Sequence, residues 1–136
     1  TVFRSAWEGF MQIKLCSVFV EDQSSAQIFY TEQLGFEVVA DIDLGEFRWL
    51  TVSEKGNSGV ELLLEPNAHP AALVFQQAIY ADGIPAAVLY TEDINHEYEN
   101  LIAKGVSFKD KPTNAGGACI IVFDDTCGNW IQLVQV

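Results

Sequence analysis

The chain has 136 residues, of which 49% are hydrophobic and 19% are charged, and its formal net charge is −12. The length suits one domain or two small fused repeats, and so apolar a composition excludes a disordered chain. The acidic balance argues against anionic partners, namely nucleic acids and anionic membrane surfaces; it would suit a cationic ligand, although an acidic solvated surface is the simpler explanation.

The first half of the chain begins with a predicted strand over residues 12–20 and a predicted helix over residues 25–34. Ser24 and Gln27 form a capping-box pattern at the helix start, and Gly35 can take the left-handed backbone that ends a helix. Three further strands are predicted, over residues 36–40, 47–53 and 60–65, and the last two of them form a hairpin.

The second half repeats this order after a proline-rich joint that contains a predicted helix at residues 71–81. A strand over residues 85–91 leads into a helix that Asp93 caps and that Gly105 ends. Three strands complete this half, over residues 106–109, 118–123 and 130–136.

The two halves echo each other at a spacing of 71 residues, which separates Asp22 from Asp93 and Glu61 from Gln132. This repeat predicts two β-α-β-β-β units with pseudo-twofold symmetry. Each helix has one apolar stripe, so the helices should cover the outer face, while the other face curls into an eight-stranded, partly open barrel of an α+β fold. The expected boundaries are 1–10 for an N-terminal extension, 11–65 and 85–136 for the repeats, 66–84 for the linker and 11–136 for the whole domain.

The three cysteines, Cys16, Cys119 and Cys127, are odd in number and widely spaced. Without a C-x-x-C pair, a disulfide framework or a zinc site is a poor interpretation, and reduced thiols in the cytoplasm are the default expectation. No apolar run reaches the roughly 18 residues that span a bilayer. Residues 1–10 lack the apolar core of a signal peptide, and we expect them to be an extension upstream of Met11.

Alternation within the strands predicts which side chains face the hollow side of the sheet. Apolar residues alternate with Glu61 in one strand and with Gln132 in its echo, so both polar side chains should point away from the helix-covered core. Small-molecule pockets are mostly apolar with a few placed polar groups, which fits this face, and a cavity filled by its own side chains is the alternative. The candidate ligand-binding residues are Leu15, Phe19, Arg48, Trp49, Glu61, Leu63, Ala86, Tyr90, Trp130 and Gln132.

Glu61 is the candidate with the clearest chemistry. A carboxylate among apolar side chains suits a general base or the partner of a cation, and Glu61 is the one residue that we would nominate as catalytic. A structural ion pair with Arg48 is the alternative, because an unpaired buried charge is costly. Arg48 could instead bind a carboxylate or phosphate, and Trp49 and Trp130 could stack on a flat ligand.

Several motifs follow one another in a fixed order: Val18-Phe19-Val20-Glu21-Asp22, Phe29-Tyr30, Leu34-Gly35-Phe36, Phe47-Arg48-Trp49-Leu50 and Phe123-Asp124-Asp125-Thr126-Cys127-Gly128-Asn129-Trp130-Ile131-Gln132-Leu133. Together with the 71-residue echo, this order resembles the glyoxalase / bleomycin-resistance / extradiol-dioxygenase superfamily, the vicinal oxygen chelate fold. The resemblance covers about residues 11–135. It implies a homodimer, since members often dimerise and share groove walls between subunits.

Metal-using members of that superfamily take ligands from four strand positions, which the resemblance places at Leu15, Ala86, Glu61 and Gln132. The first two have no donor atom, Glu61 is a good ligand and Gln132 a poor one. The resemblance thus implies a metal-independent, cofactor-free protein that binds or sequesters a drug or metabolite. A metal-dependent lyase, isomerase or dioxygenase, with His69 assisting Glu61, is the alternative, so the sequence leaves enzymatic activity open. A purely structural or protein-interaction domain with no cavity is a third interpretation.

Overall fold

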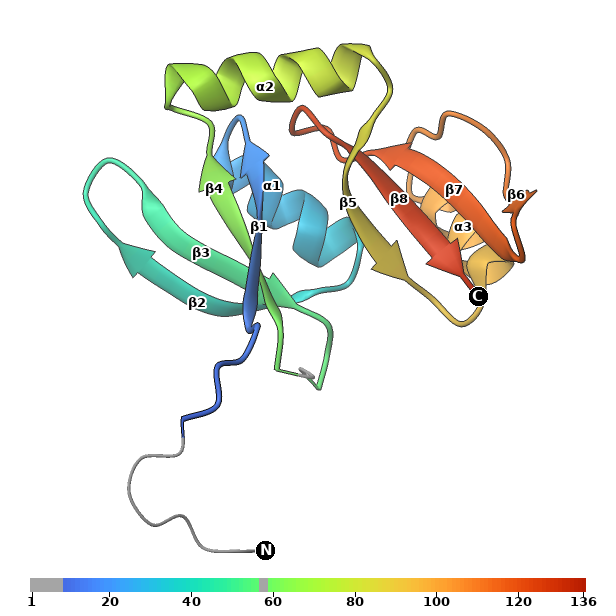
Figure 1. The fold of residues 1–136 in the computed structure, drawn as a ribbon, viewed down its shortest axis with the longest axis horizontal. Helices are drawn as coiled ribbons and strands as arrows, with labels where there is room; N and C mark the ends of the chain where they lie inside the picture. Colours follow the sequence, from blue (N-terminus) through green and yellow to red (C-terminus); the bar gives the residue numbers. More distant parts are fainter. Residues whose placement is uncertain (1–8, 57–58) are drawn as a thin grey trace, which may run out of the picture.

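The described residues, 9–56 and 59–136 of a computed structural model, form two four-stranded sheets with the strand orders β1-β4-β3-β2 and β5-β8-β7-β6 (Figure 1). The α+β class and the two β-α-β-β-β units are therefore confirmed. The sheets remain separate, and no closed barrel forms within the described part of the chain. Of the predicted extension, residues 1–8 lie outside the described residues, as do residues 57–58 of the first hairpin turn.

The first sheet comprises β1 (Leu15–Val20), β2 (Glu37–Asp43), β3 (Arg48–Ser53) and β4 (Glu61–Pro66). β1 runs parallel to β4, and the other pairs are antiparallel. Helix α1 (Gln23–Ile28) continues into a π-helical turn, η1 (Phe29–Gln33), and the chain reverses at Gly35, whose φ is 81°.

The predicted capping box at Ser24 is wrong, because Asp22 is the N-cap of α1. Asp22 keeps an extended backbone after β1, and its carboxylate accepts hydrogen bonds from Ser24 N at 3.2 Å and Ser25 Oγ at 2.8 Å. A carboxylate in this position satisfies an N–H group that has no partner inside the helix. The helix therefore starts two residues earlier than predicted.

The second sheet comprises β5 (Pro85–Tyr90), β6 (Thr113–Ala115), β7 (Ala118–Asp124) and β8 (Trp130–Gln135), with α3 (Ile94–Ala103) after β5. Asp93 caps α3 as predicted, accepting from His96 N at 3.1 Å. The strand predicted over residues 106–109 is wrong, since this segment meets the sheet only through a bridge between Phe108 and Phe123. The chain then bends away before Pro112, whose nitrogen cannot donate to a ladder, and β6 forms the sheet edge instead.

The two halves share one hydrophobic core beneath their helices. Tyr30 and Leu50 of the first half and Phe123 and Ile131 of the second are almost fully buried in the same cluster. The rings of Phe29 and Phe123 lie 6.2 Å apart across the boundary between the halves.

Helix α2 (Pro70–Ala81) links the two halves and lies across one end of both sheets (Figure 1). It begins where the His69 side chain accepts a hydrogen bond from Ala71 N at 3.0 Å, which is an N-cap role. No helix in the described part of the chain combines the length and apolar character needed to cross a membrane.

Candidate functional site

Each sheet has one edge strand at the centre of the molecule, and these strands, β1 and β5, lie beneath α2 (Figure 1). A cavity of about 380 Å³ lies between β5 and the strands β1, β3 and β4. A second cavity of about 360 Å³ lies between β1, β5 and α2. Ser17 and Ala86 line both, so the cavities adjoin and form one groove. We call it the seam groove, and its defining residues are Ser17, Glu61, Phe75, Ile79, Ala86 and Val88.

The lining of the seam groove is mostly apolar, and all of its charged groups are acidic. Glu54 and Glu61 supply carboxylates at the wider cavity. No lysine, arginine or histidine belongs to the described residues that line either cavity. A groove of this composition can hold an apolar molecule and can hydrogen-bond or ion-pair with a donor group on it.

Glu61 is oriented by a buried hydroxyl on the neighbouring strand. Thr51, which is 0% exposed, donates from Oγ1 to Glu61 Oε1 at 2.8 Å and accepts from Ala40 N at 3.1 Å. The register of β2 against β3 shifts between Val38 and Ala40, and this irregularity directs the Ala40 N–H to the hydroxyl. Because a hydroxyl has one proton, Thr51 points it at Glu61, which stays an acceptor.

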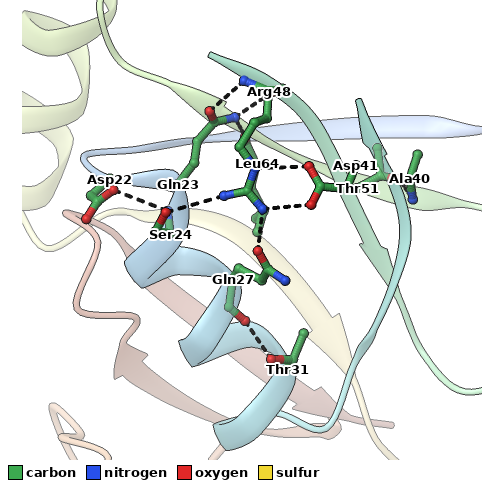
Figure 2. A network of polar contacts seen from close by, with 10 residues as sticks. All are labelled: Asp22, Gln23, Ser24, Gln27, Thr31, Ala40, Asp41, Arg48, Thr51 and Leu64. Atoms are coloured by element: carbon green, nitrogen blue, oxygen red, sulfur yellow. Dashed lines mark hydrogen bonds and ion pairs between the residues drawn. The ribbon is translucent and has the colours of Figure 1, made fainter. Parts of the chain in front are cut away.

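The predicted ion pair between Glu61 and Arg48 is wrong. Arg48 donates to both carboxylate oxygens of Asp41, at 2.9 Å each, and its remaining side-chain contacts go to Gln27 and Ser24 of α1 (Figure 2). This hydrogen-bonded guanidinium lowers the pKa of Asp41. The physical reason is strand parity, since Arg48 lies on the helix-covered face and Glu61 on the other.

Gln23 completes this contact between α1 and the first sheet. Its side-chain amide accepts from Arg48 N at 2.9 Å and donates to the carbonyl oxygens of Arg48 and Leu64 at 2.7 and 2.9 Å (Figure 2). The amide bridges β3 and β4 from the first turn of α1. The role that the structure gives Arg48 is thus to hold α1 against the sheet.

Of the predicted ligand-binding residues, Glu61, Ala86 and Phe19 line the seam groove. Leu15 lies beside Glu61 in the parallel register but outside the lining, and it is 39% exposed. Leu63 is buried on the strand that carries Glu61.

The remaining predicted residues do not line the seam groove. Trp130 stacks on Tyr80 with ring centroids 5.0 Å apart, and its Nε1 donates to the Tyr80 carbonyl at 3.0 Å. Trp49 and Tyr90 are exposed on the open face, with 71% of Tyr90 accessible. Gln132 is half-buried and pairs with Val88.

Sequence reasoning missed the contribution of α2, which presents Phe75 and Ile79 to the seam groove. The two residues are four apart, so they share one helix face, and this spacing was a visible signal. The linker helix had been expected only to connect the halves.

The 71-residue repeat does not extend to the strand register. Glu61 pairs with Leu15, but Gln132 pairs with Val88, because the pairing of β5 shifts between Pro85 and Ala87. The metal positions implied by the family resemblance are therefore not equivalent in the two halves. Within residues 9–56 and 59–136, no group of three or more histidine, cysteine, aspartate or glutamate side chains could hold a metal ion.

A buried polar network borders the groove, and we call it the junction network: Tyr30, Gln76, Asp125, Cys127 and Asn129. Asp125 is 0% exposed and accepts from Tyr30 OH at 2.6 Å, Cys127 N at 2.7 Å and Asn129 Nδ2 at 2.8 Å. Gln76 donates to the Phe19 and Cys127 carbonyls at 2.9 and 3.1 Å. These bonds join β1, α2 and the turn before β8.

The junction network contains two titratable groups that are shielded from water, the carboxyl of Asp125 and the thiol of Cys127. Burial raises the pKa of Asp125, and the hydrogen bonds from Tyr30 and Asn129 oppose that rise. Burial also raises the pKa of the Cys127 thiol to about 12. Such a thiol is a poor nucleophile, so we assign the network a structural role.

Residues 12–133 match the family model of the Glyoxalase/Bleomycin resistance protein/Dioxygenase superfamily. The chain is similar to the Bacillus subtilis (strain 168) protein YurT, with 52% identity over 92% of this chain and 99% of that protein. Among solved structures, UcmS2 is 35% identical with a TM-score of 0.82, covering 94% of this chain and 100% of UcmS2. TnmS3, an antibiotic binding protein from Streptomyces sp. CB03234, is 30% identical with a TM-score of 0.75, covering 95% and 98%. The chain therefore belongs to the glyoxalase/bleomycin resistance protein/dioxygenase superfamily.

Proposed function

We propose that this protein binds an apolar small molecule in the seam groove without using a metal ion, and that it sequesters the molecule rather than transforming it. The observation that carries the proposal is the pair of adjoining cavities that share Ser17 and Ala86 and have mostly apolar linings. The antibiotic-binding description of TnmS3 supports it. The three free cysteines would suit the reducing cytoplasm.

The described residues, 9–56 and 59–136, hold no chelating set, which supports binding over metal-dependent catalysis. Only Glu61 and Gln132 offer donor atoms at the positions used by metal-dependent relatives, and a hard divalent cation needs more oxygen ligands than these. His69 does not line the seam groove, and it caps α2. A metal-dependent lyase, isomerase or dioxygenase is the competing function.

We also propose that the protein works as a homodimer. Large apolar side chains are exposed on the open faces of both sheets: Leu15, Ile42, Trp49, Val88 and Tyr90. Apolar side chains gathered on a face commonly mark an interaction surface, and a second copy would cover them and wall the groove. Light scattering coupled to size-exclusion chromatography should give twice the chain mass, and a monomer at micromolar concentration would contradict this part of the proposal.

Nile red, an uncharged apolar dye, tests the groove directly because its fluorescence rises in apolar surroundings. The intact protein should bind the dye, and Ser17→Trp should abolish binding by filling the point where the cavities adjoin. Ser17 is exposed, so the larger side chain is expected to leave the fold intact. Ala103→Trp, an exposed position on α3 outside the groove, is the matched control.

Equal dye binding by both tryptophan variants and the parent would show that the dye binds elsewhere and would contradict the proposal.

The metal content of the purified protein tests whether it works without a metal ion. Elemental analysis of the purified protein should find less than a stoichiometric amount of any transition metal, and excess EDTA should leave dye binding unchanged. One tightly held metal ion per chain would favour the competing function.

A further inference from the structure

We infer that the ligand of the seam groove is an organic cation, an apolar or aromatic body with an ammonium group that pairs with Glu61. This inference rests on the proposed function and names the class of molecule that the groove takes.

The charges around the groove lead to this class. Its lining contains the carboxylates of Glu54 and Glu61 and no basic residue among the described ones. Lys14, whose carbonyl oxygen accepts from Glu61 N at 2.9 Å, does not line either cavity, and Arg48 is on the opposite face and is paired with Asp41. Among the described residues, the Glu61 carboxylate accepts from the neutral Thr51 hydroxyl and forms no ion pair, so a cationic ligand would provide its counter-charge.

The geometry of Glu61 leaves room for such a partner. Glu61 Oε1 accepts the hydrogen bond from Thr51, whereas no hydrogen bond is formed by Oε2 within the described part of the chain. Ala40 N–H donates to one lone pair of the Thr51 hydroxyl, and the proton of that hydroxyl is directed to Glu61. Glu61 is thus held as an acceptor, and a ligand that donates hydrogen bonds fits where one that only accepts does not.

The net charge of the whole chain also favours a cationic ligand. At −12, the protein attracts cations and repels anions before any contact is made. This long-range effect fades with salt, whereas a contact with a half-buried carboxylate fades less. The two contributions can therefore be separated by experiment.

Three compounds with one naphthalene ring test the inference: 1-naphthylmethylammonium, 1-naphthylmethanol and 1-naphthylacetate. Each is titrated against protein-bound Nile red at low and at physiological salt. The ammonium compound should displace the dye about 10-fold or more tightly than the alcohol, because a charge–charge attraction adds to its hydrogen bond with the carboxylate. The acetate should be the weakest.

Glu61→Gln should remove the preference for the ammonium compound and leave the affinity for the alcohol unchanged. Glu65→Gln is the matched control, because it lies on the same strand, removes the same charge and does not line the seam groove. The inference is overturned if the three compounds bind equally, if none displaces the dye, or if the two variants weaken the ammonium compound to the same extent. In each of these cases, dye binding that Ser17→Trp abolishes would still support the proposed function.

Discussion

The two halves of the molecule use corresponding hairpin turns in opposite ways. Glu54, in the turn between β3 and β4, is exposed and lines the seam groove. Asp125, 71 residues later, begins the turn between β7 and β8 and lies fully buried in the junction network. One turn thus contributes a carboxylate to the seam groove, and the other anchors the two halves to each other. A duplicated unit can hold its fold while its loops take on different tasks.

The outer strands differ as well. β2 has seven residues and carries the register shift that leads to Thr51 and Glu61, whereas β6 has three residues. The first half therefore contains the carboxylates that line the seam groove, and the second half contains the buried Asp125 of the junction network. The following experiments test this division, from the largest expected effect to the smallest.

Replacing Asp125 should separate the roles of the two turns most strongly. Asp125→Ala leaves the buried hydroxyl of Tyr30 and the N–H groups of Cys127 and Asn129 without their acceptor. We expect a loss of about 3–5 kcal/mol in the free energy of unfolding. Glu54→Ala, its exposed counterpart, should cost less than about 1 kcal/mol. Urea denaturation of both variants measures the difference, and equal losses would refute the division.

Gly128→Ala tests how tightly α2 is seated on the second hairpin turn. Gly128 has a φ of 97°, and an added Cβ would lie 2.8 Å from Gln76 Nε2 of the junction network. Strain and this clash together should cost about 2–3 kcal/mol. Gly105→Ala has a similar φ of 86° but an open surrounding, so it should cost only about 1 kcal/mol. A loss no larger than that of the control would mean that Gln76 moves away freely.

The fall in the free energy of unfolding at alkaline pH tests the burial of Cys127 in the turn between β7 and β8. The pKa of Cys127 rises from 9.0 to about 12 on folding, mainly through burial and then through the nearby Asp125. The folded state therefore favours the neutral thiol, so its stabilisation is complete below pH 9 and is lost as pH rises toward 12. By pH 10.5 the loss should reach about 2 kcal/mol.

Cys127→Ala should remove this share of the alkaline destabilisation. The shares of Tyr30 and Tyr80, whose pKa values also rise on folding, should remain. Urea denaturation at pH 8 and pH 10.5 gives the comparison. An unchanged pH dependence in Cys127→Ala would contradict the burial of the thiol.

The helix caps are where the two halves should still behave alike. Asp22 and Asp93 accept hydrogen bonds at the starts of α1 and α3. Changing either to alanine should lower the thermal midpoint by about 3–6 °C. Differential scanning calorimetry of the two variants should give similar shifts. A shift of the thermal midpoint in only one variant would show that the two halves also differ at their helix caps.

Much of the fold could be predicted because local patterns determine it. The alternation around Glu61, the Asp93 cap of α3, and the glycines Gly35 and Gly105 that end helices are signals carried by neighbouring residues. The edge strand of the second sheet could not be predicted in the same way. Val106 and Phe108 have the apolar alternation of a strand, yet the choice between them and residues 113–115 depends on pairing with β7.

For the candidate site, the sequence predicts which face of the sheet carries Glu61 but not which residue hydrogen-bonds to it. Strand parity placed Glu61 on the open face, but its contact with Thr51 depends on the register of β3 against β4, and the bond from Ala40 N to Thr51 depends on a shift in the pairing of β2 with β3. A shift of one residue leaves no mark in composition or periodicity. The burial of Asp125 likewise depends on Tyr30, 95 residues away, which is a contact that only the folded chain reveals.

The unequal pairing of β1 and β5 has a consequence for any molecule that enters between them. Glu61 stands opposite Leu15, whereas Gln132 stands opposite Val88, so the polar residues of the two halves are not interchangeable. The seam groove has the carboxylates of Glu54 and Glu61 in one cavity and the apolar side chains of Phe75 and Ile79 in the other. A ligand with one polar end and one apolar end should therefore bind in a single orientation, with its polar end near Glu54 and Glu61 and its apolar end near α2.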